Sequence, residues 1–386
     1  MNKTILLSVL IGLVQLPCMA QKKKPAADLK NKSSAVSEWK VPLTADRWEF
    51  TPQKAEFLEY RSVPTLRILE RNGAVVLKDC HFSSGTIEYD LEPGDSSFAG
   101  IYFRRADEQE SEYFYLRSGF AGNTLATQAI QYAPLLKGVL MWNMLPWYQG
   151  PADFKFHQWN HIKLVISGAQ LLVYVNDLHR PALEIPRLEG NILEGGLAFE
   201  GKGYIANLVL RPDVTEGLPA GEGFDPTHSD PRYGRTWLVS QPMPLPKGRE
   251  LTMDDLPKTD TGWQKIEAER RGLVNLTRLY GKSESRRMLW LKARLKVSTE
   301  QERKVAFGFM NEVWVFLNGR LAFADKNIYG SPIRKEPNGR CAVENASFNL
   351  PLQAGVNELL IGVANDFYGW GIIARLDTME GIEWMP

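Results

Sequence analysis

Short stretches in which apolar and polar residues alternate run along most of this chain. Over residues 41–212 they recur roughly every ten residues, and turn residues separate them. Alternation at every second position places one face of a strand on a core and the other in water, whereas a helix needs apolar residues three and four positions apart. No helical periodicity of useful length occurs there. The pattern therefore predicts a β-sandwich over residues 41–212.

A second strand-rich stretch begins after a segment rich in Pro, Gly and Asp. That segment, residues 213–234, has the composition of an interdomain linker. Residues 235–386 then return to short alternating stretches separated by turn residues. We predict an all-β protein with two tandem β-sandwiches, of the jelly-roll kind, connected by this linker.

The beginning of the chain predicts export. An apolar run follows Lys3, and a stretch of small residues follows the run, so residues 1–20 are predicted to be a secretory signal peptide. Residues 21–40 are polar and rich in lysine, which indicates a flexible leader. Cys18 is an alternative lipid-anchoring site, but Pro17 is unfavourable before a lipidated cysteine. We expect a periplasmic or extracellular protein without a transmembrane segment.

Charge limits the classes of partner that the protein can bind, and the cysteine content indicates whether disulfides hold the fold together. Removing residues 1–20 takes one lysine from 46 basic residues and leaves 45 basic against 45 acidic residues. A balanced charge, with no basic cluster beyond the lysines at 22–24, argues against nucleic acid or an anionic membrane as the partner. The remaining cysteines, Cys80 and Cys341, are far apart in sequence, so we expect buried thiols and no disulfide framework.

Several segments carry a resemblance to known families. The stretches GTIEYDLEPG, FAGIYFR, EYFYLR and QYAP resemble the concanavalin-like or laminin-G-like jelly roll of exported bacterial proteins, and more distantly the 3-keto-disaccharide hydrolase domain. This resemblance implies a jelly-roll fold and glycan-derived ligands but no particular activity. The later stretches VWVFLNGRLAF and FNLPLQAGVNELLIGVANDFYGWGIIARL resemble the galactose-binding-like sandwich, which serves as an accessory domain in carbohydrate-active enzymes.

Three acids occupy alternate positions in residues 85–94: Glu88, Asp90 and Glu92. On a strand they share one face, and their spacing resembles the E-x-D-x-E strand of family-16 glycoside hydrolases, whose outer glutamates act as nucleophile and acid. A retaining mechanism needs carboxyls about 5 Å apart, whereas the backbones of the outer two acids lie roughly 13 Å apart on a flat strand. Pro93 also ends the strand. A glycan hydrolase or lyase using these acids is the alternative function, and a solvated polar face is the structural interpretation.

Two further strands supply partners for the acids. Alternation places five polar or aromatic side chains opposite the apolar set: Tyr102, Arg104, Tyr113, Tyr115 and Arg117. If these strands neighbour residues 85–94, all of them share a water-facing concave surface with Glu88 and Asp90. Guanidinium groups and aromatic rings suit sugar hydroxyls and C–H patches, so we expect carbohydrate binding there. A purely structural polar network, in a cell-surface component without a small ligand, stays open.

Two aromatic loops are further candidates. Residues 138–154 carry Trp142, Trp147 and Tyr148, which suit stacking against a pyranose ring, although closure of the sandwich mouth would also explain Trp142. Residues 365–371 carry a Tyr and a Trp, and for these we favour a packed turn.

Motifs for metals and cofactors are weak. His157 and His161 are four residues apart next to a predicted strand, which places them too far apart to share one ion, so zinc is not expected. Whether the protein binds a structural calcium ion is left open by the sequence. We expect a poly- or oligosaccharide as partner, other exported proteins as further partners, and no organic cofactor.

Overall fold

The computed structural model describes residues 38–95, 97–258 and 262–385. The predicted signal peptide and most of the predicted leader therefore lie outside the described residues. The described residues belong to one compact unit. Within them, none of the helices has the length and apolar character needed to cross a membrane.

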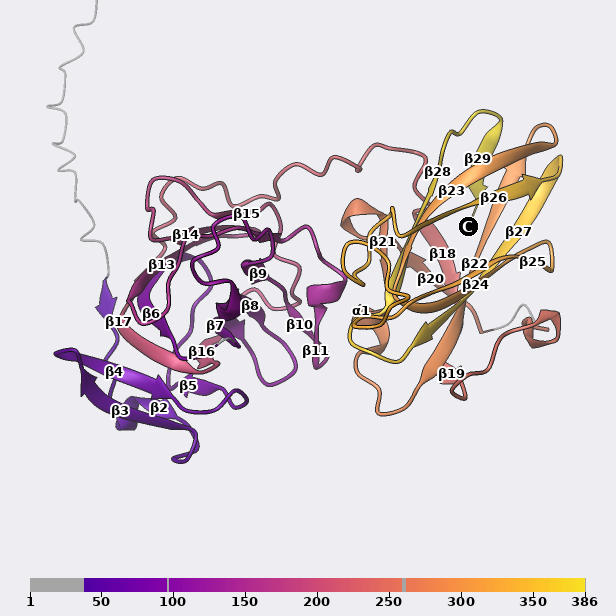
Figure 1. Ribbon diagram of the computed structural model, residues 1–386. Helices are drawn as coiled ribbons and strands as arrows, with labels where there is room; N and C mark the ends of the chain where they lie inside the picture. Colours follow the sequence, from indigo (N-terminus) through magenta and orange to yellow (C-terminus); the bar gives the residue numbers. More distant parts are fainter. Residues whose placement is uncertain (1–37, 96, 259–261, 386) are drawn as a thin grey trace, which may run out of the picture. The chain divides into compact units, whose positions relative to one another are not determined.

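Two antiparallel sheets form the first sandwich (Figure 1). The first, called the β6 sheet here, consists in spatial order of β15 (Leu183–Ile185), β14 (Gln170–Val175), β13 (Asn160–Ser167), β6 (Gly85–Pro93), β17 (Gly203–Pro212), β4 (Val63–Ile68) and β3 (Ala55–Tyr60). The second, called the β7 sheet, consists of β12 (Gln149–Gly150), β9 (Ile130–Tyr132), β8 (Glu112–Arg117), β7 (Phe98–Arg105), β16 (Gly196–Glu200), β5 (Val75–Leu77) and β2 (Trp48–Glu49). A short pair, β10 (Leu135–Leu136) and β11 (Val139–Leu140), lies outside both sheets.

The second sandwich has one large and one small sheet. The large one follows the order β20 (Gln264–Glu267), β18 (Thr236–Val239), β22 (Arg287–Val297), β27 (Gly355–Asn365), β24 (Asn311–Leu317) and β25 (Arg320–Asn327), with β19 (Met243–Pro244) and β29 (Ile382–Met385) also pairing with β22. The small one follows the order β21 (Leu273–Asn275), β28 (Gly371–Leu376), β23 (Gln301–Phe309) and β26 (Ala346–Leu352). The prediction of an all-β protein with two tandem sandwiches is confirmed.

Helical elements are few and short. The single α-helix among the described residues is α1 (Leu276–Tyr280), which Asn275 caps by accepting a hydrogen bond from the Arg278 N–H. The 3-10 turns are η1 (Ala45–Arg47), η2 (Ser118–Phe120), η3 (Met141–Asn143), η4 (Met253–Asp255) and η5 (Arg270–Gly272).

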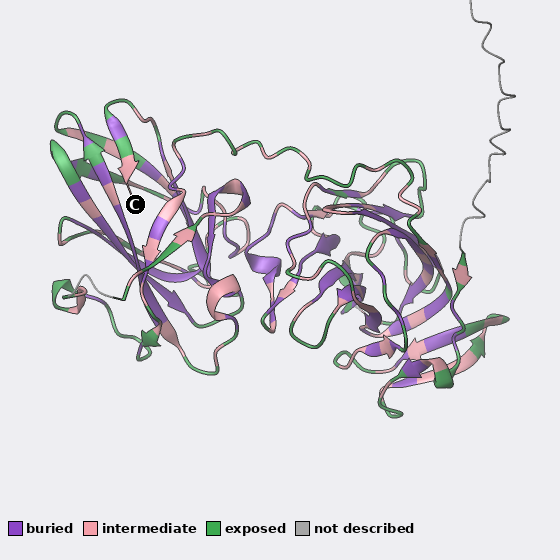
Figure 2. Ribbon diagram, turned by 180° about the vertical axis from the view of Figure 1, so that it is seen from behind, coloured by how far each residue is buried: buried purple, intermediate pink, exposed green. Residues whose placement is uncertain are grey.

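Alternation in the sequence matches the observed faces of the strands. In β6, Ile87, Tyr89 and Leu91 are buried in the core, whereas Glu88 and Asp90 point outward and are half-buried. Figure 2 shows buried residues (purple) along the inner strands of both sandwiches. Trp39 and Lys40, which the sequence analysis assigns to the leader, form strand β1 against β17, with Trp39 opposite Leu210.

The two sandwiches share an apolar cluster. Five residues that follow the first sandwich in sequence join its core cluster: Tyr233, Leu273, Met310, Cys341 and Ile373. Cys80 and Cys341 are both buried free thiols, as predicted. Turn η3 lies at this contact, where the buried Asn143 accepts a hydrogen bond from the backbone of Gly369 and another from the backbone N–H of Cys341.

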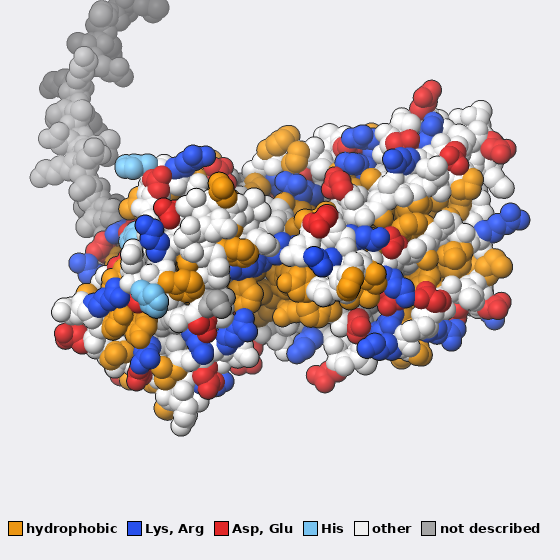
Figure 3. Space-filling view, viewed as in Figure 1, with side chains coloured by type: hydrophobic (Ala, Val, Ile, Leu, Met, Phe, Trp, Pro, Cys, Tyr) orange, Lys and Arg blue, Asp and Glu red, His pale blue; other side chains and the backbone are white. Residues whose placement is uncertain are grey.

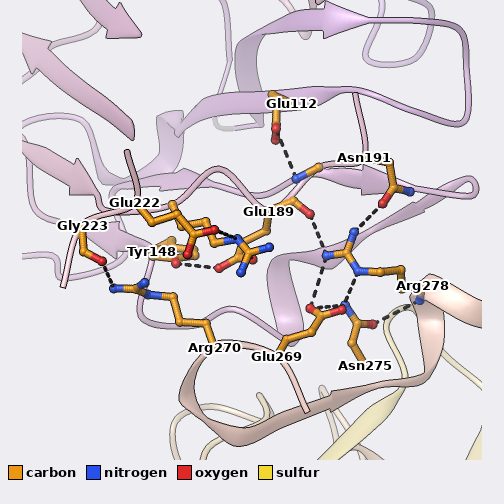
Figure 4. A network of polar contacts seen from close by, with 12 residues as sticks. Glu112, Tyr148, Glu189, Asn191, Glu222, Gly223, Glu269, Arg270, Asn275 and Arg278 are labelled. Carbon is orange, nitrogen blue, oxygen red and sulfur yellow. Dashed lines mark hydrogen bonds and ion pairs between the residues drawn. The ribbon is translucent and has the colours of Figure 1, made fainter. Parts of the chain in front are cut away.

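A polar network surrounds the same contact (Figure 4). Arg278 of α1 donates a hydrogen bond to the backbone oxygen of Glu189 at 2.8 Å and forms an ion pair with Glu269. Arg270 donates to the backbone oxygens of Gly223 and Phe224, in the segment that precedes the second sandwich. Apolar and polar contacts therefore both hold the second sandwich against the first.

Candidate functional site

A cavity of about 470 Å³ lies on the outer face of the β7 sheet. The first sandwich contributes Phe98 and Tyr102 from β7, Tyr113, Tyr115 and Arg117 from β8, and Trp142 from η3. The second sandwich contributes Tyr329 and Arg340 from the β25–β26 connection, and Phe367 and Tyr368 from the β27–β28 connection. We call this cavity the aromatic pocket. In Figure 3, hydrophobic (orange) and basic (blue) side chains gather where the strands of the two sandwiches approach each other.

Three tyrosines stand side by side on the floor of the aromatic pocket. Tyr102 and Tyr113 are cross-strand partners, with ring centroids 4.0 Å apart and planes 17° from parallel. Tyr113 and Tyr115 are two residues apart on β8 and stack at 5.0 Å. Because the rings cover one another's faces, they leave little ring face for stacking against a ligand.

Polar groups complete the floor. The Tyr102 hydroxyl donates a hydrogen bond to a Glu200 carboxylate oxygen at 2.5 Å. The Tyr115 hydroxyl donates to the side-chain oxygen of Gln131 at 2.9 Å, and Arg117 donates to the same oxygen. Burial raises the pKa of Tyr115 to about 12, so its hydroxyl stays protonated at neutral pH. The floor therefore presents oriented hydroxyl, guanidinium and carboxylate groups.

Exposed aromatic rings form the rim. Phe98, Tyr329, Phe367 and Tyr368 all belong to the small group of large apolar side chains that stay exposed, and Tyr368 is 47% exposed. Tyr329 and Phe367 stack at 5.9 Å, and the Trp142 ring meets Tyr329 edge-on at 4.8 Å. Large aromatic side chains that stay exposed around a cavity mark a binding surface. Exposing apolar rings to water is unfavourable, and binding of a ligand would cover them.

A second cavity of about 570 Å³ adjoins the aromatic pocket. Tyr102 and Glu200 line both cavities, so they lie at the boundary. The second cavity has a polar lining that includes Lys54, Arg105 and Asp107. The two cavities therefore lie next to each other over β5, β16, β7 and β8.

Five of the sequence-predicted site residues line the aromatic pocket: Tyr102, Tyr113, Tyr115, Arg117 and Trp142. They meet there because alternation sends the three tyrosines and Arg117 outward from neighbouring strands β7 and β8. Trp142 reaches the pocket from η3.

Glu88 and Asp90 lie elsewhere, which corrects the expectation that they share a face with the tyrosines. Their strand β6 belongs to the other sheet, where it pairs with β13 and β17. Glu88 forms an ion pair with Arg211 at 2.6 Å. Burial disfavours the Asp90 carboxylate, but hydrogen bonds from His161 and Asn207 outweigh that effect and lower the pKa of Asp90. A low pKa is the opposite of what a general acid requires.

Glu92 is also removed from the aromatic pocket. Its side chain is 3% exposed and binds the Tyr60 hydroxyl at 3.1 Å and Arg61 at 3.2 Å. The three acids of β6 are therefore all held in polar contacts on the β6 sheet, where His161 lies between Glu88 and Asp90 and Glu92 has its own partners. These contacts favour the structural interpretation of that strand.

Arg104 was expected on the tyrosine face but is buried inside the sandwich, at 2% exposure. A β-bulge interrupts the pairing of β7 with β16, because Phe103 and Arg104 together oppose the single residue Leu197. Arg104 has a φ of 48°, and its guanidinium donates to the backbone oxygens of Ser83 and Gly168, both at 2.7 Å. The bulge breaks the alternation on which the expectation rested.

Trp147 and Tyr148 also lie outside the aromatic pocket. The Trp147 ring packs under the guanidinium of Arg271 at 5.1 Å. Tyr148 is buried, and its hydroxyl donates to Glu189 at 2.8 Å (Figure 4). Trp147 therefore contacts the second sandwich, whereas Tyr148 is held within the first.

Sequence reasoning missed Phe98, Glu200, Tyr329, Arg340 and Phe367 as pocket residues. Tyr368 was considered only as part of a packed turn. In the structure one part of that turn is packed and another is not: Trp370 is fully buried, whereas Phe367 and Tyr368 line the cavity. The cluster of aromatic residues in 365–371 was the available signal for this loop. Nothing in the sequence pairs that loop with β8.

No group of three His, Cys, Asp or Glu side chains arranged to hold a metal ion occurs in the described part of the chain.

Comparison with known proteins found matches among solved structures but no matching family. No protein-family model matches the chain, and no curated protein sequence matches it. Among solved structures, a CBM66 carbohydrate-binding module from Bacillus subtilis aligns at 12% identity over 42% of this chain and 95% of its own, with a TM-score of 0.33. A β-glucanase from Bacillus licheniformis aligns at 9% identity over 46% of this chain and 98% of its own, with a TM-score of 0.32.

Domain 4 of an arabinanase from Geobacillus stearothermophilus, solved with arabinotriose, aligns at 13% identity over 42% of this chain and 77% of its own, with a TM-score of 0.29. With TM-scores this low, no residue of these proteins is matched to a residue of this chain.

Proposed function

We propose that the protein binds an oligo- or polysaccharide in the aromatic pocket and the adjoining cavity. One observation carries this proposal: a single cavity combines exposed aromatic rings at its rim with fixed hydroxyl, guanidinium and carboxylate groups on its floor. Sugars present alternating C–H patches and hydroxyls, which need this combination. The volume of about 470 Å³ also falls within the range of small-molecule sites.

The adjoining cavity supports a ligand with more than one sugar ring. Because Tyr102 and Glu200 line both cavities, a chain could continue from one to the other past this pair. The second sandwich, expected to be accessory, supplies four residues of the pocket wall and so takes part in the proposed binding.

The proposal is tested by a glycan array followed by calorimetry on the best ligand. Tyr368→Ala and Phe367→Ala each remove an exposed ring of the rim, and each is expected to weaken binding about tenfold. Phe224→Ala is the matched control, because the Phe224 side chain is 84% exposed and lies outside both cavities.

Three outcomes are informative. Loss of affinity in the two rim variants but not in Phe224→Ala supports the proposed site. Equal affinity in all variants would place the sugar elsewhere. Absence of binding to every oligosaccharide at millimolar concentration would favour a structural surface component.

Export through residues 1–20 stays part of the proposal. It is tested by expressing the full chain and sequencing the N-terminus of the exported fraction, where cleavage after Ala20 is expected.

A further inference from the structure

Charge is distributed unevenly in the aromatic pocket. Arg71, Arg117 and Arg340 line it, against a single acid, Glu200. The Glu200 carboxylate is engaged by the Tyr102 hydroxyl and by the backbone N–H of Gly73 at 3.3 Å. Arg117 and Arg340 bond to uncharged oxygens and Arg71 packs on the Phe98 ring, and within the described part of the chain none of the three forms an ion pair with a carboxylate. The pocket is therefore positively charged overall.

Arg340 differs from the other arginines that are buried in the described structure. Arg104 and Arg270 each donate to two backbone carbonyl oxygens. Arg340, at 3% exposure, makes one side-chain hydrogen bond, a long one of 3.3 Å to the side-chain oxygen of Gln128, and its Nε has no partner. A guanidinium has five N–H donors, so most of the hydrogen-bonding capacity of Arg340 is unused.

Arg117 brings a second positive charge to the same place. It donates to the backbone oxygen of Gln128 at 2.6 Å, so both guanidinium groups converge on this residue. Burial and, secondarily, the charge of Arg117 lower the pKa of Arg340 to about 10. A buried guanidinium beside a second, half-buried one, with no carboxylate partner for either, is unfavourable unless an anion joins them.

We infer that the saccharide bound in the aromatic pocket carries an acidic substituent, a carboxylate or a sulfate ester, which Arg340 and Arg117 bind. This inference rests on the proposed carbohydrate binding and adds the class of sugar. Planar guanidinium groups bind carboxylate and sulfate oxygens in pairs, which matches the unused donors of Arg340. Arg71, which is exposed and packs over the Phe98 ring at 5.6 Å, adds positive charge at the entrance.

The test is calorimetry with matched pairs of oligosaccharides on the purified full-length chain. One pair is tetragalacturonate and its methyl ester, and the other is a sulfated galactotetraose and plain galactotetraose. We expect the acidic member of one pair to bind about tenfold or more tightly than its neutral partner, with affinity falling as salt rises. The pair that shows this difference identifies the substituent.

Variants locate the effect. Arg340→Met should abolish the preference for the acidic member, so that its affinity falls about tenfold or more toward that of the neutral member. Arg320→Met is the matched control, because Arg320 is exposed on β25 outside the two cavities. If Arg340→Met does not fold, as judged by circular dichroism, the half-buried Arg117→Met gives the same comparison.

Failure of this inference is distinct from failure of the proposed function. Equal affinity for acidic and neutral members, unaffected by salt, would overturn the acidic substituent and leave carbohydrate binding standing. Absence of binding by all four oligosaccharides and by a broad glycan array would overturn both.

Discussion

Asn143 and Gly369 exchange two hydrogen bonds across the contact between the sandwiches. The Asn143 side chain donates to the Gly369 oxygen at 3.3 Å and accepts from the Gly369 N–H at 3.1 Å. Asn143 is fully buried, and it follows Trp142, while Gly369 follows Tyr368. The pair therefore connects the two segments that carry Trp142 and Tyr368, whose rings meet at 5.5 Å in the aromatic pocket.

Asn143→Ala should destabilise the protein by about 1–3 kcal/mol, because it leaves two backbone groups at the contact without partners. The free energy of unfolding from urea titration measures this effect. Gln158→Ala, at an exposed side chain outside the contact, is the control and should change stability little. An Asn143→Ala variant as stable as the unmodified protein would show that the pair does not hold the sandwiches together.

Gly369→Ala tests the same contact by adding volume. A Cβ at this position would lie 2.3 Å from Cγ of Met144 and 2.9 Å from Oδ1 of Asn143. We expect a loss of about 1–3 kcal/mol of stability and, if the aromatic pocket binds sugar, weaker binding as Tyr368 is displaced. Unchanged stability with unchanged sugar affinity would mean that the loop adapts freely.

Stability should fall as the pH rises from about 5 to 8, because of two buried carboxyls near the contact (Figure 4). Glu112 and Glu189 are 1% and 3% exposed, and burial raises the pKa of each to about 7. Both groups hold protons more tightly in the folded state than in the unfolded state. Their stabilising effect is therefore complete below the ordinary glutamate pKa and is lost as the pH rises through about 7.

Melting temperatures between pH 5 and 8 measure this dependence. Glu112→Gln and Glu189→Gln cannot ionise, so each should flatten the profile by an amount on the order of 3 kcal/mol at the alkaline end. His161, whose pKa is raised by its hydrogen bond to Asp90, contributes with the same sign, and both Gln variants retain it. Profiles that keep the slope of the unmodified protein would assign the dependence to other groups.

Arg104→Met should destabilise the protein by roughly 3–5 kcal/mol, as expected for removing one partner from a buried charge network. The change deprives two backbone oxygens of their donor and leaves Glu112 without its nearby positive charge. Arg67→Met is the control, because its ion pair with Glu56 is exposed and should contribute less than about 1 kcal/mol. Equal melting temperatures for the two variants would contradict the structural role of the bulge.

Glu88→Gln separates the binding function from the hydrolase alternative. Glu88 is paired with Arg211 on the β6 sheet, so we expect oligosaccharide affinity to be unchanged and stability to fall by about 1 kcal/mol at most. Calorimetry and an assay for released reducing ends measure the two properties. Loss of measurable sugar cleavage in this variant would restore the acidic strand as a catalytic site.

Local features of the structure were predictable because they depend on neighbours in sequence. The two-residue period of β6 and β8 correctly places Ile87 in the core and Tyr113 and Tyr115 on an outer face. The same reasoning failed at Arg104, because a bulge inserts an extra residue and no residue type in FAGIYFRR announces it.

Which strands become neighbours is a different matter, since it depends on pairing between distant segments. Alternation alone assigned a face to Glu88, but pairing with β13 and β17 put that face on the opposite side of the sandwich from Tyr102. The aromatic pocket further requires Tyr368 to meet Trp142, and the docking of the second sandwich achieves this. Residue identities along the chain thus account for the strands, the core and the outward tyrosines, whereas long-range packing assembled the pocket and left the guanidinium of Arg340 without a carboxylate partner.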